Sequence, residues 1–423
     1  MSLALRAYAA ASSVAFPFIK NRLRKTLSTG FDERCGAYRR EKLDAIRGAK
    51  TFWLHAVSVG EVQAASPIVA KIGRSGWDGA MILSTVTETG AQSAGESMGD
   101  RIAAHVYAPL DVPRIVRKAC EALRPMAYAS MEIEVWPNLL SELRLRGVPR
   151  CLLNARISDR GWQRVSYMKS AIREAYELFD MILARSDEDA RRIAAIGVSA
   201  AKIRVTGDSK IDAIIERRET ASGELPLLAK RLSLGKEPVF VAGSTRKGED
   251  EVVLRAFAGL RSGPDTKGAR LIIAPRHPEM AAAIAKMASA TGRVSLFSEL
   301  GEGEAPEIIV VDVIGALYGL YGLATAVFVG GSLVPSGGQN ILEPASWGIP
   351  ILHGPYMDDF AEPTAELDAF GAAYRVERAE DIEILWRGAA LGALPDSSAI
   401  CTEYFASRSG AATRAWIYLE RYL

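Results

Sequence analysis

Short apolar segments alternate with longer segments of helical periodicity from residue 51 onward. The apolar segments lack the regular apolar–polar alternation of a strand with one wet face, so they predict strands buried on both faces, as in a parallel sheet. In the first half of the chain these predicted strands are residues 51–55, 80–84, 102–107, 126–129, 150–153, 181–184 and 202–206. Amphipathic helices are predicted between them, for example over 112–123, 139–146 and 187–196.

The alternation starts again after a polar stretch, residues 216–237. The second set of predicted strands is 239–242, 271–274, 308–311, 326–329, 350–352 and 373–376. A chain of 423 residues is long enough for two hydrophobic cores. The pattern therefore predicts an α/β protein with two doubly wound, Rossmann-like domains that face each other across a cleft, with a hinge near residues 207–211.

The same pattern predicts the division of the chain. We expect an N-terminal segment, a first domain, a linker, a second domain and a C-terminal helix that returns to the first domain. Their expected bounds are 1–30, 31–208, 209–237, 238–400 and 401–423.

The N-terminal segment is apolar and is followed at once by a basic cluster. Its uninterrupted part, residues 7–19, is shorter than the ~20 residues that a spanning helix needs. The cluster consists of Lys20, Arg22, Arg24 and Lys25. An apolar segment next to such a cluster favours contact with an anionic membrane surface. The alternative is an ordinary first helix packed on the protein.

Charge and cysteine content exclude other classes. The net charge is only +2, which argues against a nucleic-acid-binding protein, although residues 1–50 hold 11 basic against four acidic side chains. The four cysteines show no CxxC spacing, as expected in a reducing compartment, and the four histidines form no HExxH motif. No metal or cofactor is therefore expected. The triplet 187–189 resembles a metal-binding DxD motif, but a solvated first helical turn capped by Asp187 explains it better.

Candidate chemistry in the first domain follows the predicted strands at their carboxyl ends, where ligands bind in such sheets. Ser58 and Gly60 open the helix after the first strand, and Glu61 lies in its first turn. A carboxylate beside a helix N-terminus stays ionised, so it can serve as a general base. A glutamate that merely complements the helix dipole is the alternative. Glu132 and Glu134 follow another predicted strand, next to Trp136. Two carboxylates at such a place are costly to bury unless they are paired with cations or take part in function. A carboxylate near Glu61 would also raise the pKa of Glu61. Lys210 supplies a cation at a later strand end.

The most distinctive loop of the second domain is glycine-rich and runs from 330 to 338. Asn340, with Glu343 three residues later, predicts a capping box and a helix over about 341–347. Free N–H groups and the helix dipole would make an anion site there, and the alternative is a tight strand–helix turn without a ligand. The loop after strand 239–242, with Ser244 and Thr245, offers hydroxyls and N–H groups for a phosphate.

Taken in order, these loops resemble those of the 3-deoxy-D-manno-octulosonic acid (Kdo) transferases of Gram-negative bacteria. The matching stretches are 55–61, 132–138, 154–156, 205–210, 275–278, 330–335 and 340–344. Each stretch alone is a weak signal, whereas the ordered set over almost the whole chain is strong. The resemblance implies a GT-B glycosyltransferase that transfers Kdo from CMP-Kdo to a lipid A precursor, with inversion. It also implies that the enzyme acts at the cytoplasmic face of the inner membrane, in lipopolysaccharide biosynthesis.

The resemblance also implies roles for individual residues. Glu61 would be the general base, and Lys210 with a carboxylate of the Glu132/Glu134 pair would support the transition state. The implied donor-binding residues are Pro275, Arg276, Ile314, Gly315, Ala316, Asn340, Ile341, Leu342 and Glu343, beside Ser244 and Thr245. The first domain would bind the acceptor and the second the CMP-sugar.

The chain departs from the family pattern in places. Ile314 and Ala316 stand where Met and Glu are usual, which leaves only backbone contacts expected at that turn. Arg246 and Gln339 stand where His is common. Two other functions remain open: a GT-B enzyme with a nucleotide-diphosphate donor, and a non-catalytic binding protein on the same scaffold.

Overall fold

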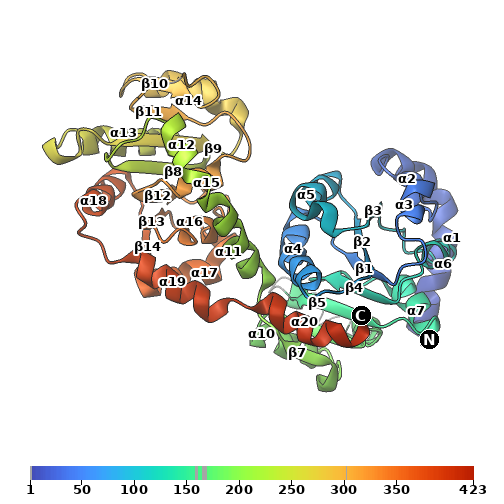
Figure 1. Ribbon diagram of the computed structural model, residues 1–423. Helices are drawn as coiled ribbons and strands as arrows, with labels where there is room; N and C mark the ends of the chain where they lie inside the picture. Colours follow the sequence, from blue (N-terminus) through green and yellow to red (C-terminus); the bar gives the residue numbers. More distant parts are fainter. Residues whose placement is uncertain (1, 158–160, 164–168, 302) are drawn as a thin grey trace. The chain divides into compact units, whose positions relative to one another are not determined.

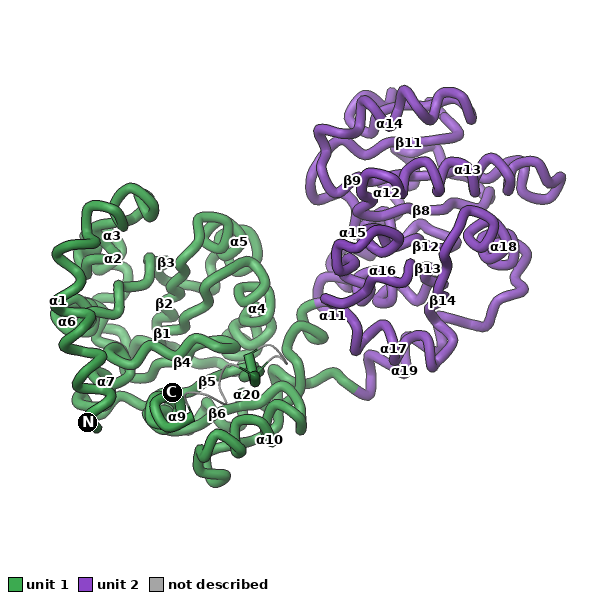
Figure 2. The backbone as a smooth tube through the Cα atoms, turned by 180° about the vertical axis from the view of Figure 1, so that it is seen from behind, with its two compact units in different colours: residues 1–213, 408–423 green, residues 214–407 purple. Residues whose placement is uncertain are grey.

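The computed structural model describes residues 2–157, 161–163, 169–301 and 303–423, and two parallel sheets organise them (Figure 1). The chain divides into two compact units (Figure 2). The first comprises Met1–Ala213 with Arg408–Leu423, and the second comprises Ile214–Ser407. Their boundary lies within helix α11, Ser209–Ser222. The predicted pair of doubly wound, Rossmann-like domains is therefore confirmed.

The first sheet has seven strands in the order β3-β2-β1-β4-β5-β6-β7, all parallel. Its strands are β1 Thr51–His55, β2 Ala80–Thr85, β3 Ala104–Tyr107, β4 Ala127–Met131, β5 Arg150–Ala155, β6 Met181–Ala184 and β7 Ile203–Val205. Its main helices are α4 Val59–Arg74, α5 Glu88–Met98, α6 Pro113–Leu123, α7 Pro137–Leu145, α9 Lys169–Tyr176 and α10 Asp187–Ala195, with short α2 Phe31–Arg34 and α3 Arg40–Asp44 before β1.

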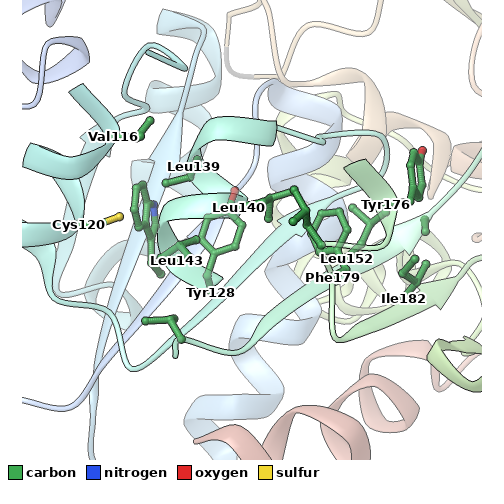
Figure 3. Packing of buried hydrophobic residues seen from close by; sticks show 14 of the residues in the cluster. Val116, Cys120, Tyr128, Leu139, Leu140, Leu143, Leu152, Tyr176, Phe179 and Ile182 are labelled. Carbon is green, nitrogen blue, oxygen red and sulfur yellow. The ribbon is translucent and has the colours of Figure 1, made fainter. Parts of the chain in front are cut away.

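Helices cover both faces of this sheet, which explains why its strands are continuous apolar runs. On one face, Val116 and Cys120 of α6 and Leu140 of α7 pack in one cluster with Tyr128 of β4 and Leu152 of β5 (Figure 3). On the other face, α4 and the C-terminal helix α20, Ala411–Leu419, pack against each other and share one buried cluster with strands β1, β2, β4, β5 and β6.

The second sheet also has seven parallel strands, in the order β10-β11-β9-β8-β12-β13-β14. Its strands are β8 Val239–Thr245, β9 Arg270–Pro275, β10 Val294–Leu296, β11 Ile308–Val310, β12 Ala326–Val329, β13 Ile351–His353 and β14 Ala373–Arg375. Its helices are α12 Leu225–Arg231, α13 Glu249–Arg261, α14 Ala281–Ala288, α15 Leu317–Tyr321, α16 Leu342–Ala345, α17 Ala361–Phe370, α18 Ala379–Ala390 and α19 Ser397–Arg408. Buried residues of α13, α14 and α18 form the core on one face.

Helix α1, Leu3–Thr26, is packed on the first unit along one side only. It buries Leu5 and Phe16 against the protein, while Leu3, Val14 and Phe18 are 85%, 67% and 84% exposed. Within the described residues, no helix is both long enough and apolar enough to cross a bilayer.

The structure corrects some local predictions. The edge strand β10 has no counterpart among the predicted strands, because it is three residues long and only half-buried. Ser186, rather than Asp187, caps α10 by accepting a hydrogen bond from the Asp189 amide. Residues 209–237, for which the sequence predicts a linker, contain α11 and α12.

Candidate active site

Each sheet reverses its strand order beside its first strand. In the first unit β1 lies between β2 and β4, and in the second β8 lies between β9 and β12. The loops that leave these neighbouring strands at a reversal point diverge, which creates a natural crevice for ligands. The candidate catalytic loops follow β1 and β4, and the candidate donor loops follow β8, β9 and β12. Both groups of residues therefore lie where this architecture binds ligands.

Glu61 is buried in the first turn of α4 and is 8% exposed. Its carboxylate accepts one hydrogen bond, from the Val57 amide to Oε2 at 2.6 Å. Burial raises the pKa of Glu61 to about 7; the Val57 amide opposes this shift, Glu134 and Glu132 add to it, and Lys210 opposes it. The sequence predicted the rise but named the neighbouring carboxylates as its cause, whereas loss of water is the larger effect. A carboxyl group with such a pKa can accept and release a proton near neutral pH.

Glu132 forms the centre of an ion-pair cluster. Its Oε1 lies 2.5 Å from Lys210 Nζ, and its Oε2 accepts a hydrogen bond from Arg156 Nε at 2.6 Å. Burial alone would raise the pKa of Glu132, but the two cations outweigh burial and lower it. Its backbone has φ of +54°, an uncommon conformation for a residue with a side chain. Glu132 is thus an ionised carboxylate held at a fixed point.

Asn154 and Asp208 set the position of Lys210. Asn154 Oδ1 accepts a hydrogen bond from the Ser209 amide, and its Nδ2 donates to Asp208 Oδ1. The same Asp208 oxygen accepts from the Lys210 amide at 2.9 Å. These bonds hold the first turn of α11 in place, and with it the backbone from which the Lys210 side chain extends. No such role was predicted for Asn154, although its place in the matching stretch 154–156 was a signal.

Glu134 belongs to a separate group from Glu132. Its Oε2 accepts a hydrogen bond from Trp136 Nε1 at 2.9 Å and lies 3.8 Å from His55 Nε2. His55 is 1% exposed, and its Nδ1 faces the carbonyl oxygen of Ser84 at 3.2 Å. The same Nδ1 lies 2.9 Å from Ser84 Oγ, so Ser84 holds this side of the ring while Nε2 faces Glu134. The two carboxylates that the sequence treated as a pair therefore have different partners.

Glu249 occupies the anion site that the sequence predicted for a ligand. It is fully buried at the start of α13, and its two oxygens accept four backbone hydrogen bonds of 2.7–2.9 Å. The donors are the amides of Arg246, Gly331, Ser332 and Leu333. The prediction that this glycine-rich turn offers free N–H groups to a ligand is therefore wrong at these positions. The loop's amides bind the chain's own carboxylate.

The turn must also accommodate close backbone approach. A Cβ atom at Gly330 would lie 2.5 Å from the carbonyl oxygen of Ser244, so glycine is required there. Ser244 itself has φ of +55°. The loops after β8 and β12 are thus pressed together beside Glu249.

The predicted capping box at Asn340 is also wrong. Helix α16 begins at Leu342, and Glu343 turns instead to Arg217 of α11, with 2.9 Å between Arg217 Nη1 and Glu343 Oε1. Asn340 Oδ1 accepts from the Leu342 amide. The guanidinium of Arg217 also lies 3.9 Å from the centre of the Tyr318 ring. Burial raises the pKa of Glu343, and Arg217 opposes this shift.

A cavity of about 430 Å³ opens over the loops after β8, β9 and β12. It is lined by Thr245, Arg246, Lys247, Asp250, Pro275, His277, Glu279, Met280 and Val334. Thr245 Oγ1 donates to Asp250 Oδ1 at 2.7 Å, and burial raises the pKa of Asp250 to about 6.

Of the predicted donor residues, only Thr245 and Pro275 line this cavity. Residues 314–316 form a turn before α15, where Gly315 has φ of +94° and Ile314 is 91% exposed. Asp189 of the acidic triplet accepts hydrogen bonds from the Ile157 amide and Arg185 Nε, as a structural residue does. In the described ranges, no group of three or more His, Cys, Asp or Glu side chains is arranged to hold a metal ion.

Known structures define the class of this fold. The crystal structure of a glycosyltransferase from Rickettsia africae superimposes with a TM-score of 0.55 at 12% sequence identity, over 89% of this chain and 98% of that chain. Together with two parallel sheets that reverse beside their first strands, this likeness shows that the chain has the GT-B fold.

Sequence comparison defines the family. Residues 29–213 match the family described as 3-deoxy-D-manno-octulosonic-acid transferase (kdotransferase). The 3-deoxy-D-manno-octulosonic acid transferase of Bordetella pertussis is 31% identical over 388 residues, 89% of this chain and 88% of that protein. The corresponding transferase of Haemophilus influenzae is 31% identical over 334 residues, 78% of this chain and 76% of that protein. The chain belongs to the Kdo transferase family and is a glycosyltransferase, as its motifs indicated.

Proposed function

We propose that this enzyme transfers Kdo from CMP-Kdo to the lipid A precursor lipid IVA, with inversion, in lipopolysaccharide biosynthesis. The observation that carries the proposal is the cluster of Glu61, Glu132 and Lys210 at the reversal point of the first sheet. A buried carboxyl group with a pKa of about 7 lies near an ionised, cation-bound carboxylate. That arrangement suits the activation of a sugar hydroxyl.

In the proposed reaction, an acceptor hydroxyl attacks the ketosidic carbon of the donor from the face opposite the phosphate. The new carbon–oxygen bond forms as the bond to the phosphate oxygen breaks, and Glu61 takes the hydroxyl proton. CMP leaves as a phosphate monoester anion. Lys210 and Arg276 are the cations proposed to neutralise this charge. Glu132 holds Lys210 in place, and Glu134 orients Trp136 beside the acceptor.

The nucleotide is assigned to the second unit. Pro275, Arg276, residues 314–316 and residues 340–343 are proposed to hold the CMP part of the donor, with backbone contacts only at Ile314 and Ala316. Glu343 is proposed to accept hydrogen bonds from the ribose hydroxyls.

Donor choice tests this function directly. The purified enzyme is incubated with CMP-Kdo or with UDP-sugars, each with a lipid A precursor, and released CMP or UDP is measured. Release of CMP with formation of a Kdo-lipid product is expected. Release of UDP would favour the nucleotide-diphosphate enzyme instead, and release of neither nucleotide would favour a binding protein.

Metal independence is part of the proposal, because Lys210 and Arg276 can carry the charge that a divalent cation would otherwise neutralise. Turnover should therefore survive EDTA. Complete loss of turnover that Mg²⁺ restores would contradict this expectation.

Helix α1 is proposed to lie on the cytoplasmic face of the inner membrane and to bring the enzyme to its lipid acceptor. The support is its exposed apolar side chains Leu3, Val14 and Phe18, together with the basic cluster 20–25. Each basic residue at an anionic surface contributes about 1 kcal/mol, less at high salt.

Replacing Lys20, Arg22, Arg24 and Lys25 with Gln tests this location. Binding to anionic vesicles should weaken more than binding to neutral vesicles, while transfer to a detergent-solubilised acceptor persists. Unchanged vesicle binding would mean that the membrane contact lies elsewhere.

A further inference from the structure

The cavity over β8, β9 and β12 lies beside the proposed nucleotide residues but is not lined by most of them. It shares Pro275 with that set, whereas residues 314–316 and 340–343 lie outside it. Its volume of about 430 Å³ is within the range of small-molecule sites. A CMP-sugar has a second part to place, the eight-carbon sugar acid. The cavity adjoins the proposed nucleotide residues through Pro275.

Arg246 lines this cavity, and its side chain has a buried N–H donor without a hydrogen-bond partner among the described residues. Its Nε is buried, and no acceptor among the described residues lies within hydrogen-bonding distance of it. A buried donor without a partner is costly, and such groups in binding sites are commonly satisfied by the ligand. The backbone at Arg246 is already fixed, because its amide donates to Glu249 Oε2 at 2.8 Å. The side chain therefore extends from a rigid point.

We propose that Arg246 binds the carboxylate of the donor's sugar acid, so that this cavity is the subsite for the sugar and Arg246 is its specificity-determining residue. The inference rests on the proposed function and names the ligand group that the cavity receives. The planar fork of a guanidinium matches a carboxylate with two parallel hydrogen bonds. The sugar's carboxylate is attached to the same carbon as the phosphate, so it lies next to the nucleotide.

The rest of the lining suits the remainder of such a sugar. Asp250 and Glu279 can accept hydrogen bonds from sugar hydroxyls. Pro275, Met280 and Val334 offer an apolar surface to a deoxy carbon, which has no hydroxyl to satisfy.

The experiment compares CMP with CMP-Kdo, because CMP has the phosphate but lacks the sugar acid. In the full-length enzyme, Arg246→Gln should raise the KM of CMP-Kdo about tenfold or more, while the inhibition constant of CMP changes by less than about twofold. Arg246→Lys should fall between wild type and Gln, since it keeps the charge and loses the fork. Arg255→Gln removes an exposed charge from the following helix α13 and should change neither constant.

The outcomes separate the possible errors. Equal weakening of CMP and CMP-Kdo by both substitutions at Arg246 would place that side chain on the phosphate and overturn the inference. No change in either constant would also overturn it. A wild-type enzyme that binds CMP but releases none from CMP-Kdo would overturn the proposed function, and this inference with it.

Discussion

Glu61 and Glu249 lie at similar places in the two halves of the molecule, and their surroundings differ. Each lies in the first turn of the helix that follows the first strand of its sheet, Glu61 as the third residue of α4 and Glu249 as the first of α13, and each follows a glycine, Gly60 or Gly248. Glu61 accepts one backbone hydrogen bond, whereas Glu249 accepts four. A carboxylate surrounded by N–H groups is a structural anion, while one with a single donor in a dry site is poised to take a proton. The number of amides, and not the position in the fold, separates the two roles.

Removing the charge at Glu61 is expected to have the largest effect. Glu61→Gln should lower turnover by roughly 10²-fold or more, the scale of a lost general base, with donor binding intact. Below about pH 4.5, where Glu61 is protonated in both the folded and the unfolded state, the variant's unfolding free energy should change little, because only one N–H bond is affected. Glu96→Gln, at an exposed position of α5, is the matched control. Near-normal turnover of Glu61→Gln would remove Glu61 from the catalytic role.

The opposite pattern is expected at Glu249. Glu249→Gln replaces one accepting oxygen by an NH₂ group, which in either orientation of the side chain faces two backbone amides, so the free energy of unfolding should fall by about 2 kcal/mol. Chemical denaturation of the full-length enzyme measures this, with Glu251→Gln on the exposed side of α13 as control. A stable variant with slow chemistry would mean that the two glutamates have similar roles after all.

The pH dependence sharpens the comparison. With the pKa of Glu61 at about 7, kcat/KM should fall about tenfold per pH unit below neutrality. The folded state holds this proton up to about pH 7, whereas the unfolded state releases it near 4.5. Glu61 therefore makes the folded state less stable as pH rises through this window, and Glu61→Gln should abolish that loss. If kcat/KM began to fall only below about pH 5, the pKa of Glu61 would be close to its ordinary value, and its carboxyl group would be well solvated.

The smallest effect is expected at Arg217, which supports Glu343 from α11. Arg217→Ala should raise the donor KM roughly threefold, because a half-exposed ion pair contributes at most about 1 kcal/mol. Without Arg217 the pKa of Glu343 rises further, so the increase in KM should grow as pH falls. Arg218→Ala removes only a bond to the Ser346 carbonyl and is the neighbouring control. Equal effects of the two variants would indicate a general loss of packing by α11.

Local sequence was enough to predict the architecture and the loops that are proposed to carry the chemistry. Strands that are buried on both faces consist of uninterrupted apolar residues, which a short stretch of sequence is enough to reveal. The three-residue strand β10 was not predicted, because a half-buried strand at the edge of the sheet does not need such a run. Loops at the carboxyl ends of parallel strands share one edge of a sheet, so Glu61, Glu132 and Lys210 could be grouped before any coordinates.

Only the tertiary structure decided which partners these groups have. Glu249 reaches the amide of Gly331 across 82 residues of sequence, and Arg217 reaches Glu343 across 126. The rise in the pKa of Glu61 comes first from exclusion of water, which depends on everything packed around it. Hydrogen bonding and desolvation are set by neighbours in space. The sequence therefore determined which loops hold the candidate catalytic residues, and packing determined which carboxylate is free to accept a proton.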